Sequence, residues 1–221
     1  MKIKSVFERD FREVEERFPK LRYVWSEKFK AWLITGSLDI CDQDGEYWET
    51  FEVIILVPRA YPYCVPVLFE TSEILPRDID WHISKGGVCC YDIEHNLLVL
   101  SRKGIFLANF IGTKIYSYFA NQLIKLGGGN YAGGEYAHHF EGVVQYYQEM
   151  HGLSLQGTIR VLQTLLQPLK LGRNGLCPCG SGRKLKKCHD LTMEELKSLG
   201  TAKIRKDLRN LQTWQVTLKN G

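Results

Sequence analysis

The stretch KAWLITGSLDICDQDGEYWETFEVIILV (residues 30–57) decides the fold that we expect. Its two ends alternate apolar and polar residues and are rich in β-branched and aromatic side chains, which is typical of half-buried strands. Between them, Asp44–Gly45 is a turn signal. The stretch therefore predicts a β-hairpin. The proline-marked segment PRAYPYCVP (58–66) then leads into PVLFET (66–71), which predicts a third strand.

Helical patterns lie on both sides of these strands. SVFERDFREVEERF (5–18) has a cap residue at Ser5, apolar residues at helical spacing and a stop at Pro19. IFLANFIGTKIYSYFANQLIKL (105–126) is apolar around more than half of its circumference, which predicts a largely buried helix. Residues 75–102 show no clear periodicity and predict irregular chain. This order of elements predicts an α+β fold in which helices pack on an antiparallel meander sheet.

The second half of the chain differs in character. A glycine-rich connection (127–134) precedes two shorter helical patterns (138–150 and 153–169), a cysteine-rich segment and two polar helical segments. Residues 1–150 carry 16 Lys and Arg against 21 Asp and Glu, whereas residues 151–221 carry 13 against 4. We therefore expect a main domain over 1–150, a helical linker over 151–172, and a basic C-terminal module over 173–221. A solvated basic tail and a docking surface are both compatible with this charge.

Composition favours an intracellular globular protein. The chain is 44% hydrophobic and 24% charged, and it has no run of about 18 apolar residues and no apolar leader. Seven cysteines form an odd set without a regular framework, which suits metal-binding or reactive thiols in a reducing cytoplasm better than disulfides. We expect a cytoplasmic location without a membrane partner.

The segment DWHISKGGVCCYDI (80–93) raises the question of a nucleophilic thiol. Adjacent residues of extended chain point to opposite sides, so one of Cys89 and Cys90 should be buried. The other could act as a nucleophile through its thiolate. His82 could donate a hydrogen bond to a developing oxyanion or accept a proton. Two structural thiols remain the alternative, because free cysteine is usually a small core residue.

The proline run and the cysteine segment together resemble the ubiquitin-conjugating enzyme family. The family has a Pro-x-x-Tyr-Pro-aromatic-x-x-Pro run, a His-Pro-Asn-Ile stretch and a Gly-x-x-Cys-Leu-Asp turn with the catalytic cysteine. The ungapped match covers these positions in turn: Pro58, Tyr61, Pro62, Tyr63 and Pro66, then Asp80, Trp81, His82 and Ile83, then Gly87, Cys90 and Asp92. The resemblance implies a ubiquitin-conjugating fold over about residues 5–150 and an acyl thioester on Cys90, with Cys89 as the alternative position.

Two departures from the family pattern stand out. His82 occupies the position of the asparagine that is held to stabilise the oxyanion, and HNLLVLSRKG (95–104) replaces the tryptophan region that usually follows the site. In these features the chain is similar to bacterial ubiquitin-conjugating-like proteins of antiphage (CBASS-type) operons. That resemblance implies a ubiquitin-like protein or the C-terminus of a cGAS-like nucleotidyltransferase as partner, with or without a separate activating enzyme.

Three cationic residues and one carboxylate surround the cysteines in sequence. Lys85, Arg102 and Lys103 would favour the Cys90 thiolate if the fold brings them close. Asp92 could orient an incoming lysine or simply form a turn. Cys41 and Cys64 are expected to be packing residues, and His95, His138 and His139 structural or surface histidines.

The segment CPCGSGRKLKKCH (177–189) predicts a metal site. Cys177, Cys179, Cys188 and His189 offer three thiolates and one imidazole, the donor set of a closed structural zinc site. With the preceding GRNGLC, the segment resembles the SEC-C motif, a small zinc-binding module at the end of a bacterial secretion ATPase. We expect a structural Zn²⁺ that folds the module, because so short a segment has almost no core.

Two functions from different classes fit this sequence. The first is a conjugating enzyme that carries an activated protein C-terminus on Cys90 and transfers it to an amine. The second is an inactive binding adaptor that docks through the zinc tail, a reading that the missing asparagine favours. Nucleic-acid binding ranks third, because few aromatic residues interleave the basic ones.

Overall fold

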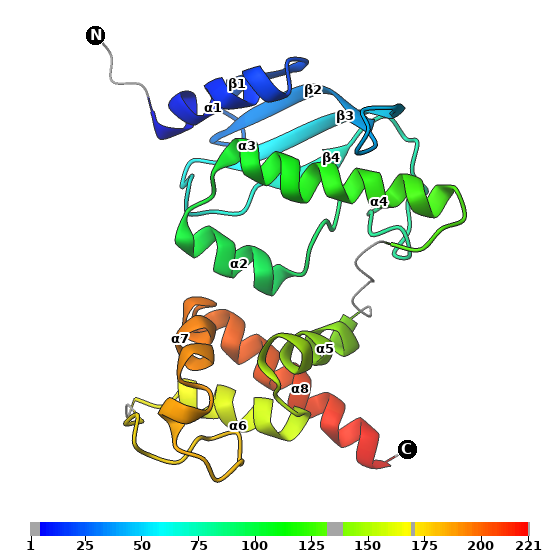
Figure 1. Cartoon of the computed structure of the whole chain (residues 1–221). Helices are drawn as coiled ribbons and strands as arrows, with labels where there is room; N and C mark the ends of the chain where they lie inside the picture. Colours follow the sequence, from blue (N-terminus) through cyan, green and yellow to red (C-terminus); the bar gives the residue numbers. More distant parts are fainter. Residues whose placement is uncertain (1–4, 132–138, 169–170, 221) are drawn as a thin grey trace. The chain divides into compact units, whose positions relative to one another are not determined.

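The structure is a computed structural model that describes residues 5–131, 139–168 and 171–220, without the side chains of residues 139, 140, 219 and 220. The chain forms two compact units, Met1–Gly134 and Glu135–Gly221. The first unit contains the strands β1–β4 and the helices α1–α4, and the second contains the helices α5–α8 (Figure 1). None of the helices in the described part of the chain combines the length and the apolar composition needed to cross a membrane.

The first unit is built on a four-stranded antiparallel sheet in the order β1-β2-β3-β4. Its strands are β1 (Leu21–Ser26), β2 (Ala31–Cys41), β3 (Tyr47–Pro58) and β4 (Val67–Glu70). β2 and β3 form the predicted hairpin, with Ile34 opposite Ile55. Gly45 in its turn has a φ of 86°, which favours glycine. The predicted hairpin and third strand are confirmed, and β1 is an additional strand.

Two helical segments cover the sheet. α1 (Val6–Arg17) starts with a capping box between Ser5 and Glu8 and buries Phe7, Phe11 and Val14. A continuous helix runs through α3 (Leu107–Phe110), a π-helical turn η1 (Ile111–Tyr116) and α4 (Ser117–Leu126). In Figure 1 this helix crosses the sheet, and the Phe119 and Phe51 rings stack at 4.2 Å between centroids. Both predicted helices are confirmed, and the α+β class is correct.

The region between β4 and α3 is more regular than its sequence suggested. Residues 82–90 form a small antiparallel hairpin, which we call the cysteine hairpin, with a bridge between Ile83 and Cys89. A second bridge, between Phe69 and Val88, places it at the β4 edge of the sheet. α2 (Glu94–Lys103) follows, with a buried side that includes His95 and Leu97. The expectation of irregular chain over residues 75–102 was therefore wrong for the hairpin and for α2, because tertiary contacts order both.

The second unit is helical. It contains α5 (His139–His151), α6 (Leu155–Leu165), the 3₁₀ turn η2 (Leu185–Lys187), α7 (Asp190–Ser198) and α8 (Thr201–Asn220). A buried carboxylate, Asp207, accepts hydrogen bonds from Tyr147 Oη at 3.1 Å and from Lys203 Nζ at 2.9 Å. α5 and α6 contact each other and α8 within this unit. The expected division instead placed α5 in the first domain and α6 in a linker.

Candidate thiol site and candidate metal centre

The cysteine hairpin gives its two cysteines opposite environments. The Cys89 N–H donates to Leu68 O at 2.9 Å, and the Cys89 side chain is 5% exposed within the core of the first unit. Cys90 is exposed at the end of the hairpin, where its N–H donates to His82 O at 2.7 Å. The expected burial of one cysteine and exposure of the other is confirmed. Cys90 therefore presents an exposed thiol next to a backbone hydrogen bond that closes the hairpin, and this thiol is accessible to another protein.

The turn of the cysteine hairpin requires glycine for internal packing. Gly87 has a φ of 81°, and a Cβ at this position would lie 2.5 Å from Glu70 O and 2.7 Å from Arg77 Nη1. Behind the turn, the 1% exposed Glu70 carboxylate pairs with Arg77 Nη2 at 2.8 Å. Gly86, in contrast, has no close neighbour. Gly87 therefore serves the packing of the turn, and the open approach to the turn lies at Gly86.

His82 contacts Cys90 through its backbone carbonyl, which accepts the hydrogen bond from Cys90 N. It has a φ of 52°, an unfavourable left-handed conformation for a residue with a Cβ. The His82 ring lies 6.0 Å, between centroids, from the Tyr131 ring. Such strained residues persist only where their surroundings hold them, and they are frequent at functional sites. His138 lies outside the described residues, as does the side chain of His139.

Asp92 forms the next turn of the chain. Its Oδ1 accepts hydrogen bonds from Ile93 N at 2.7 Å and Asn96 Nδ2 at 2.9 Å, while its Oδ2 pairs with Lys114 Nζ at 2.6 Å. The carboxylate thus has a structural role in the start of α2. Lys114, on the π-helical turn, was not singled out in the sequence, because nothing local connects it to a residue 22 positions away.

The environment of Cys90 opposes ionisation. Partial desolvation, and next the negative charge of Asp92, raise the pKa of Cys90 above its usual value. Asp92, rather than Lys85, Arg102 or Lys103, is the main electrostatic influence on this thiol. Burial raises the pKa of Cys89 to about 12 and that of Cys64 to about 11. Cys90 is thus the most accessible of the three thiols, but it is not a preformed thiolate.

The second site gathers Cys177, Cys179, Cys188 and His189, whose donor atoms all lie within 4.8 Å of one another. Neighbouring donors are 3.7 Å apart for Cys179 Sγ and Cys188 Sγ, and 3.2 Å for Cys188 Sγ and His189 Nδ1. A tetrahedral zinc ion with bonds of about 2.0–2.3 Å requires spacings of roughly 3.5–3.8 Å. The side chains therefore fit a metal ion of this size, and three thiols with one imidazole are consistent with zinc.

The imidazole of His189 is oriented for binding metal through Nδ1. Its Nε2 lies 2.9 Å from His151 O, at the end of α5. A carbonyl only accepts hydrogen bonds, so Nε2 carries the proton and the Nδ1 lone pair faces the three sulfurs. A backbone carbonyl behind a histidine ligand is a common device that fixes both tautomer and ring orientation.

The segment that carries these ligands, residues 173–189, is called the metal loop below. Arg160 of α6 donates from Nε to Pro178 O at 3.0 Å and from Nη2 to Cys179 O at 2.5 Å. Burial raises the pKa of Cys179, but hydrogen bonds with Ser181, and next with Cys177 and Cys188, together outweigh it and lower that pKa to about 6. The metal loop is thus hydrogen-bonded to α6, and the lowered pKa of Cys179 favours the thiolate form of this ligand.

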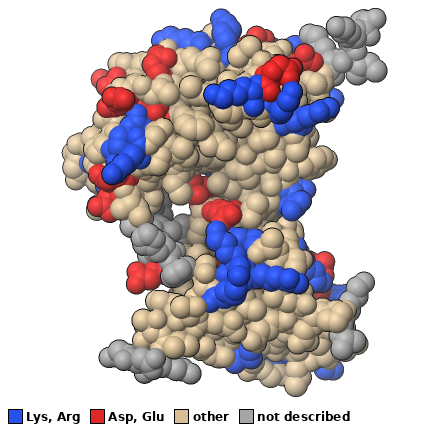
Figure 2. Space-filling model, turned by 180° about the vertical axis from the view of Figure 1, so that it is seen from behind, with Lys and Arg blue, Asp and Glu red and all other residues tan. Residues whose placement is uncertain are grey.

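The surface of the metal loop is basic and partly apolar. Figure 2 shows Lys and Arg side chains gathered on the second unit. The exposed cations of the loop's C-terminal half are Arg183, Lys184, Lys186 and Lys187. Leu176, next to Cys177 in the loop, is 68% exposed, and Leu191, two residues after His189 in α7, is 85% exposed. Such a surface can bind an acidic partner that presents apolar side chains.

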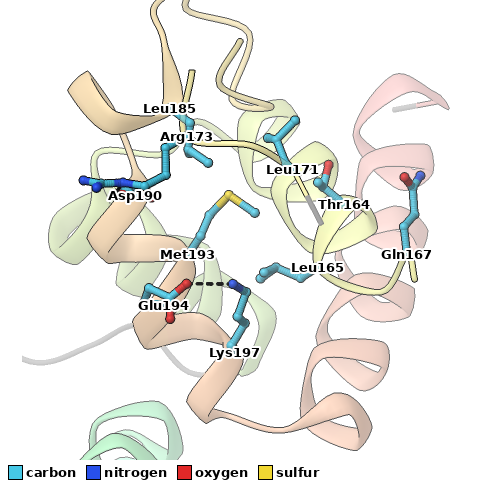
Figure 3. Close-up of a pocket in the computed structure, with 10 residues that line it drawn as sticks. All are labelled: Thr164, Leu165, Gln167, Leu171, Arg173, Leu185, Asp190, Met193, Glu194 and Lys197. Carbon is cyan, nitrogen blue, oxygen red and sulfur yellow. Dashed lines mark hydrogen bonds and ion pairs between the residues drawn. The ribbon is translucent and has the colours of Figure 1, made fainter. Parts of the chain in front are cut away.

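A pocket of about 650 Å³ lies in the second unit among the end of α6, the metal loop and α7 (Figure 3). Its apolar lining comes from Leu165, Leu171, Leu185 and Met193. Its charged groups already pair, Arg173 with Asp190 at 2.6 Å and Lys197 with Glu194 at 2.7 Å. The pocket therefore offers apolar surface rather than free catalytic groups.

Comparison with known proteins agrees with the geometry of the metal loop. The family model of the SEC-C motif matches residues 173–189. All four predicted ligands lie within this match. The chain is also 45% identical over 51 residues to the protein translocase subunit SecA of Bordetella petrii (strain ATCC BAA-461 / DSM 12804 / CCUG 43448). That similarity covers 21% of this chain and 6% of the SecA subunit. No solved structure matches the chain.

Proposed function

We propose that this protein is a ubiquitin-conjugating-like enzyme that carries an activated protein C-terminus as a thioester on Cys90. The observation that supports the proposal most strongly is the exposed Cys90 at the hydrogen-bonded end of an ordered hairpin, with Cys89 buried beside it. A carrier thiol needs to meet two large partners in turn, so accessibility on a rigid support matters more than an enclosed pocket.

The proposed reaction has two acyl transfers. In the first, the Cys90 sulfur attacks the activated carbonyl, a C–S bond forms, the bond from the carbonyl carbon to the donor's leaving group breaks, and the thiol proton passes to that leaving group. In the second, an amine attacks the thioester, a C–N bond forms, the C–S bond breaks and Cys90 leaves as a thiolate. The amine's proton passes to a base. His82 is the proposed group for oxyanion stabilisation or for proton acceptance.

The partners in this proposal come from the sequence resemblance. The acyl donor is a ubiquitin-like protein or the C-terminus of a cGAS-like nucleotidyltransferase in bacterial antiphage defence, with or without a separate activating enzyme. In this role the metal loop, with its exposed cations, recruits the donor, the activating enzyme or the target.

A Cys90→Ser variant tests the carrier role. Serine at this position would trap the acyl group as an oxyester that resists thiol reductants, because a C–O bond replaces the C–S bond. The purified variant is incubated with ATP and lysate of the native host, and covalent adducts are mapped by peptide mass spectrometry. We expect the acyl modification on residue 90, and none on residue 64 of a matched Cys64→Ser control. Absence of an oxyester on residue 90, with folding retained, would argue against the proposal.

Binding without chemistry is the second candidate function. The raised pKa of Cys90 and the left-handed His82 in place of an asparagine favour it, as does the exposed surface of the metal loop. Charge reversal of Lys184 and Lys186 to Glu separates the two functions. If the protein is an adaptor, the variant loses its protein partners, and neither it nor the wild type forms a covalent adduct. If the protein is an enzyme, the variant still forms an adduct on Cys90 with purified donor and activating enzyme.

A further inference from the structure

One face of the continuous helix from Leu107 to Leu126 carries polar side chains toward the chain around Cys90. These side chains belong to Lys114, Tyr118, Gln122 and Lys125, at spacings of four, four and three residues, and we call them the polar ridge. Residues at such spacings lie along one side of a helix. Tyr118 is 6% exposed and Gln122 is 1% exposed, so their polar atoms need protein partners.

Three successive carbonyls, those of Asp80, Trp81 and His82, supply these partners at the start of the cysteine hairpin. Lys125 Nζ donates to Asp80 O, and Gln122 Nε2 donates to Trp81 O at 3.1 Å. Tyr118 Oη lies 3.4 Å from both Trp81 O and His82 O. The His82 carbonyl also accepts the 2.7 Å hydrogen bond from Cys90 N. The polar ridge thus contacts the segment that closes the hairpin end carrying Cys90.

The ridge also reaches the His82 side chain through Tyr131. Tyr131 Oη donates to Gln122 Oε1 at 2.9 Å, so both ends of the Gln122 amide have partners. Lys125 Nζ lies 4.9 Å from the centre of the Tyr131 ring, a cation–π contact. The same Tyr131 ring lies beside the His82 ring. Gln122 therefore contacts the carbonyl of the residue before His82 and, through Tyr131, the surroundings of the His82 ring.

The other end of the ridge acts on the chain after Cys90. Lys114 Nζ pairs with Asp92 Oδ2 at 2.6 Å, and the Lys114 side chain is 32% exposed. Lys114 belongs to the π-helical turn, a type of local irregularity that often accompanies functional sites. Its cation partly neutralises the carboxylate that acts on the Cys90 thiol.

We propose that the polar ridge is a set of positioning residues for the thiol site, in which Gln122 holds the His82–Cys90 hairpin end and Lys114 offsets the charge of Asp92. This inference rests on the proposed role of Cys90 as the reacting thiol. Among the described residues, the titratable groups near Cys90 include, besides Asp92 and Lys114, the Cys89 thiol, the Tyr91 and Tyr118 phenols and His82.

The first experiment measures the alkylation rate of Cys90 by iodoacetamide against pH, by peptide mass spectrometry of the full chain. In Lys114→Met the Asp92 charge is no longer offset, so the apparent pKa of Cys90 rises. We expect a rate about threefold lower at neutral pH, which corresponds to a shift of about half a pKa unit. Lys114→Arg keeps the cation and is expected to follow the wild-type profile.

A superimposable pH profile for Lys114→Met and wild type would overturn the electrostatic part of the proposal. If Lys114→Met does not fold, Asp92→Asn replaces it, since it keeps an oxygen acceptor and removes the charge. That variant is expected to lower the apparent pKa of Cys90, and an unchanged pKa would contradict us.

The second experiment measures hydrogen exchange at the Cys90 amide. Gln122→Met keeps side-chain length but removes both hydrogen bonds, and we expect exchange about tenfold faster. Gln43→Met, the same change at an exposed turn position, is the matched control. Equal exchange in the two variants would overturn the positioning role of Gln122. Neither experiment needs a thioester, so a failure of the ridge and a failure of the carrier function give different results.

Discussion

Cys89 and Cys90 are adjacent in sequence, but they differ in what they contribute to stability. Cys89 is 5% exposed in the core, so truncation leaves a small cavity. We expect Cys89→Ala to lower the free energy of unfolding of the first unit by about 1–2 kcal/mol, and Cys90→Ala to change it by less than about 0.5 kcal/mol. Urea unfolding followed by tryptophan fluorescence measures both, because Trp25, Trp32, Trp48 and Trp81 lie in this unit. Equal losses for the two variants would show that the assigned burial is incorrect.

The buried thiol also makes stability depend on alkaline pH. Burial raises the pKa of Cys89 from its usual 9.0 to about 12 in the folded protein. Below pH 9 the thiol is protonated in both the folded and the unfolded chain, and its full contribution is present. Between pH 9 and 12 the Cys89 thiol ionises only in the unfolded chain. The free energy of unfolding therefore falls by about 1.4 kcal/mol per pH unit.

Comparison with Cys89→Ala isolates this effect. The difference in free energy of unfolding between wild type and the variant should shrink as pH rises above 9 and change sign by about pH 11. A difference that stays constant from pH 8 to 11 would be inconsistent with a protonated, buried thiol.

At the residue scale, local sequence predicted some site residues and missed others. Alternation along extended chain predicted that one of the two cysteines is buried, because neighbouring side chains point to opposite faces. The cysteine spacing predicted the four donors that the metal loop gathers. Lys114 and Gln122 were not predicted, since their partners, Asp92 and the Trp81 carbonyl, come from distant segments.

The metal loop depends on α6 as an element. Arg160 donates hydrogen bonds to two carbonyls that lie next to the first pair of ligands. We expect Arg160→Met to weaken zinc binding by roughly tenfold, as for other groups that orient ligands, while all four ligands remain. Competition with a chromophoric chelator measures the affinity. The exposed Arg205→Met is the control, and equal affinities in both variants would refute the role of Arg160.

Element prediction followed hydrophobic periodicity and failed where tertiary contacts dominate. The β2–β3 hairpin and the helices α1 and α3–α4 have strong local patterns, so their positions were predicted correctly. The cysteine hairpin has only a few residues per strand and is ordered by the bridge between Val88 and Phe69 at the sheet edge. α2 lacks a side-chain cap and a strong apolar stripe, which explains why its sequence reads as irregular.

At the scale of the whole molecule, we expect bound metal to stabilise the second unit and not the first. Within residues 173–189 only Cys177 and Leu185 are buried, so the metal loop lacks a core of its own. We expect chelation of zinc to remove hydrogen-exchange protection from residues 173–190, and to leave β2 and β3 protected. Hydrogen exchange of the full chain with and without chelator, followed by peptide mass spectrometry, measures both regions separately. Loss of protection in β2 and β3, or no change in the metal loop, would contradict this division.

The proposed thioester on Cys90 can be tested directly by mass. Wild type, Cys89→Ala and Cys90→Ala are each incubated with ATP and lysate of the native host, and intact masses are measured without reductant. We predict an adduct of protein mass in wild type and Cys89→Ala that thiol reductant removes, and no such adduct in Cys90→Ala. An adduct that disappears only in Cys89→Ala, or no adduct in any of the three folded proteins, would contradict the assignment of Cys90 as an acyl carrier.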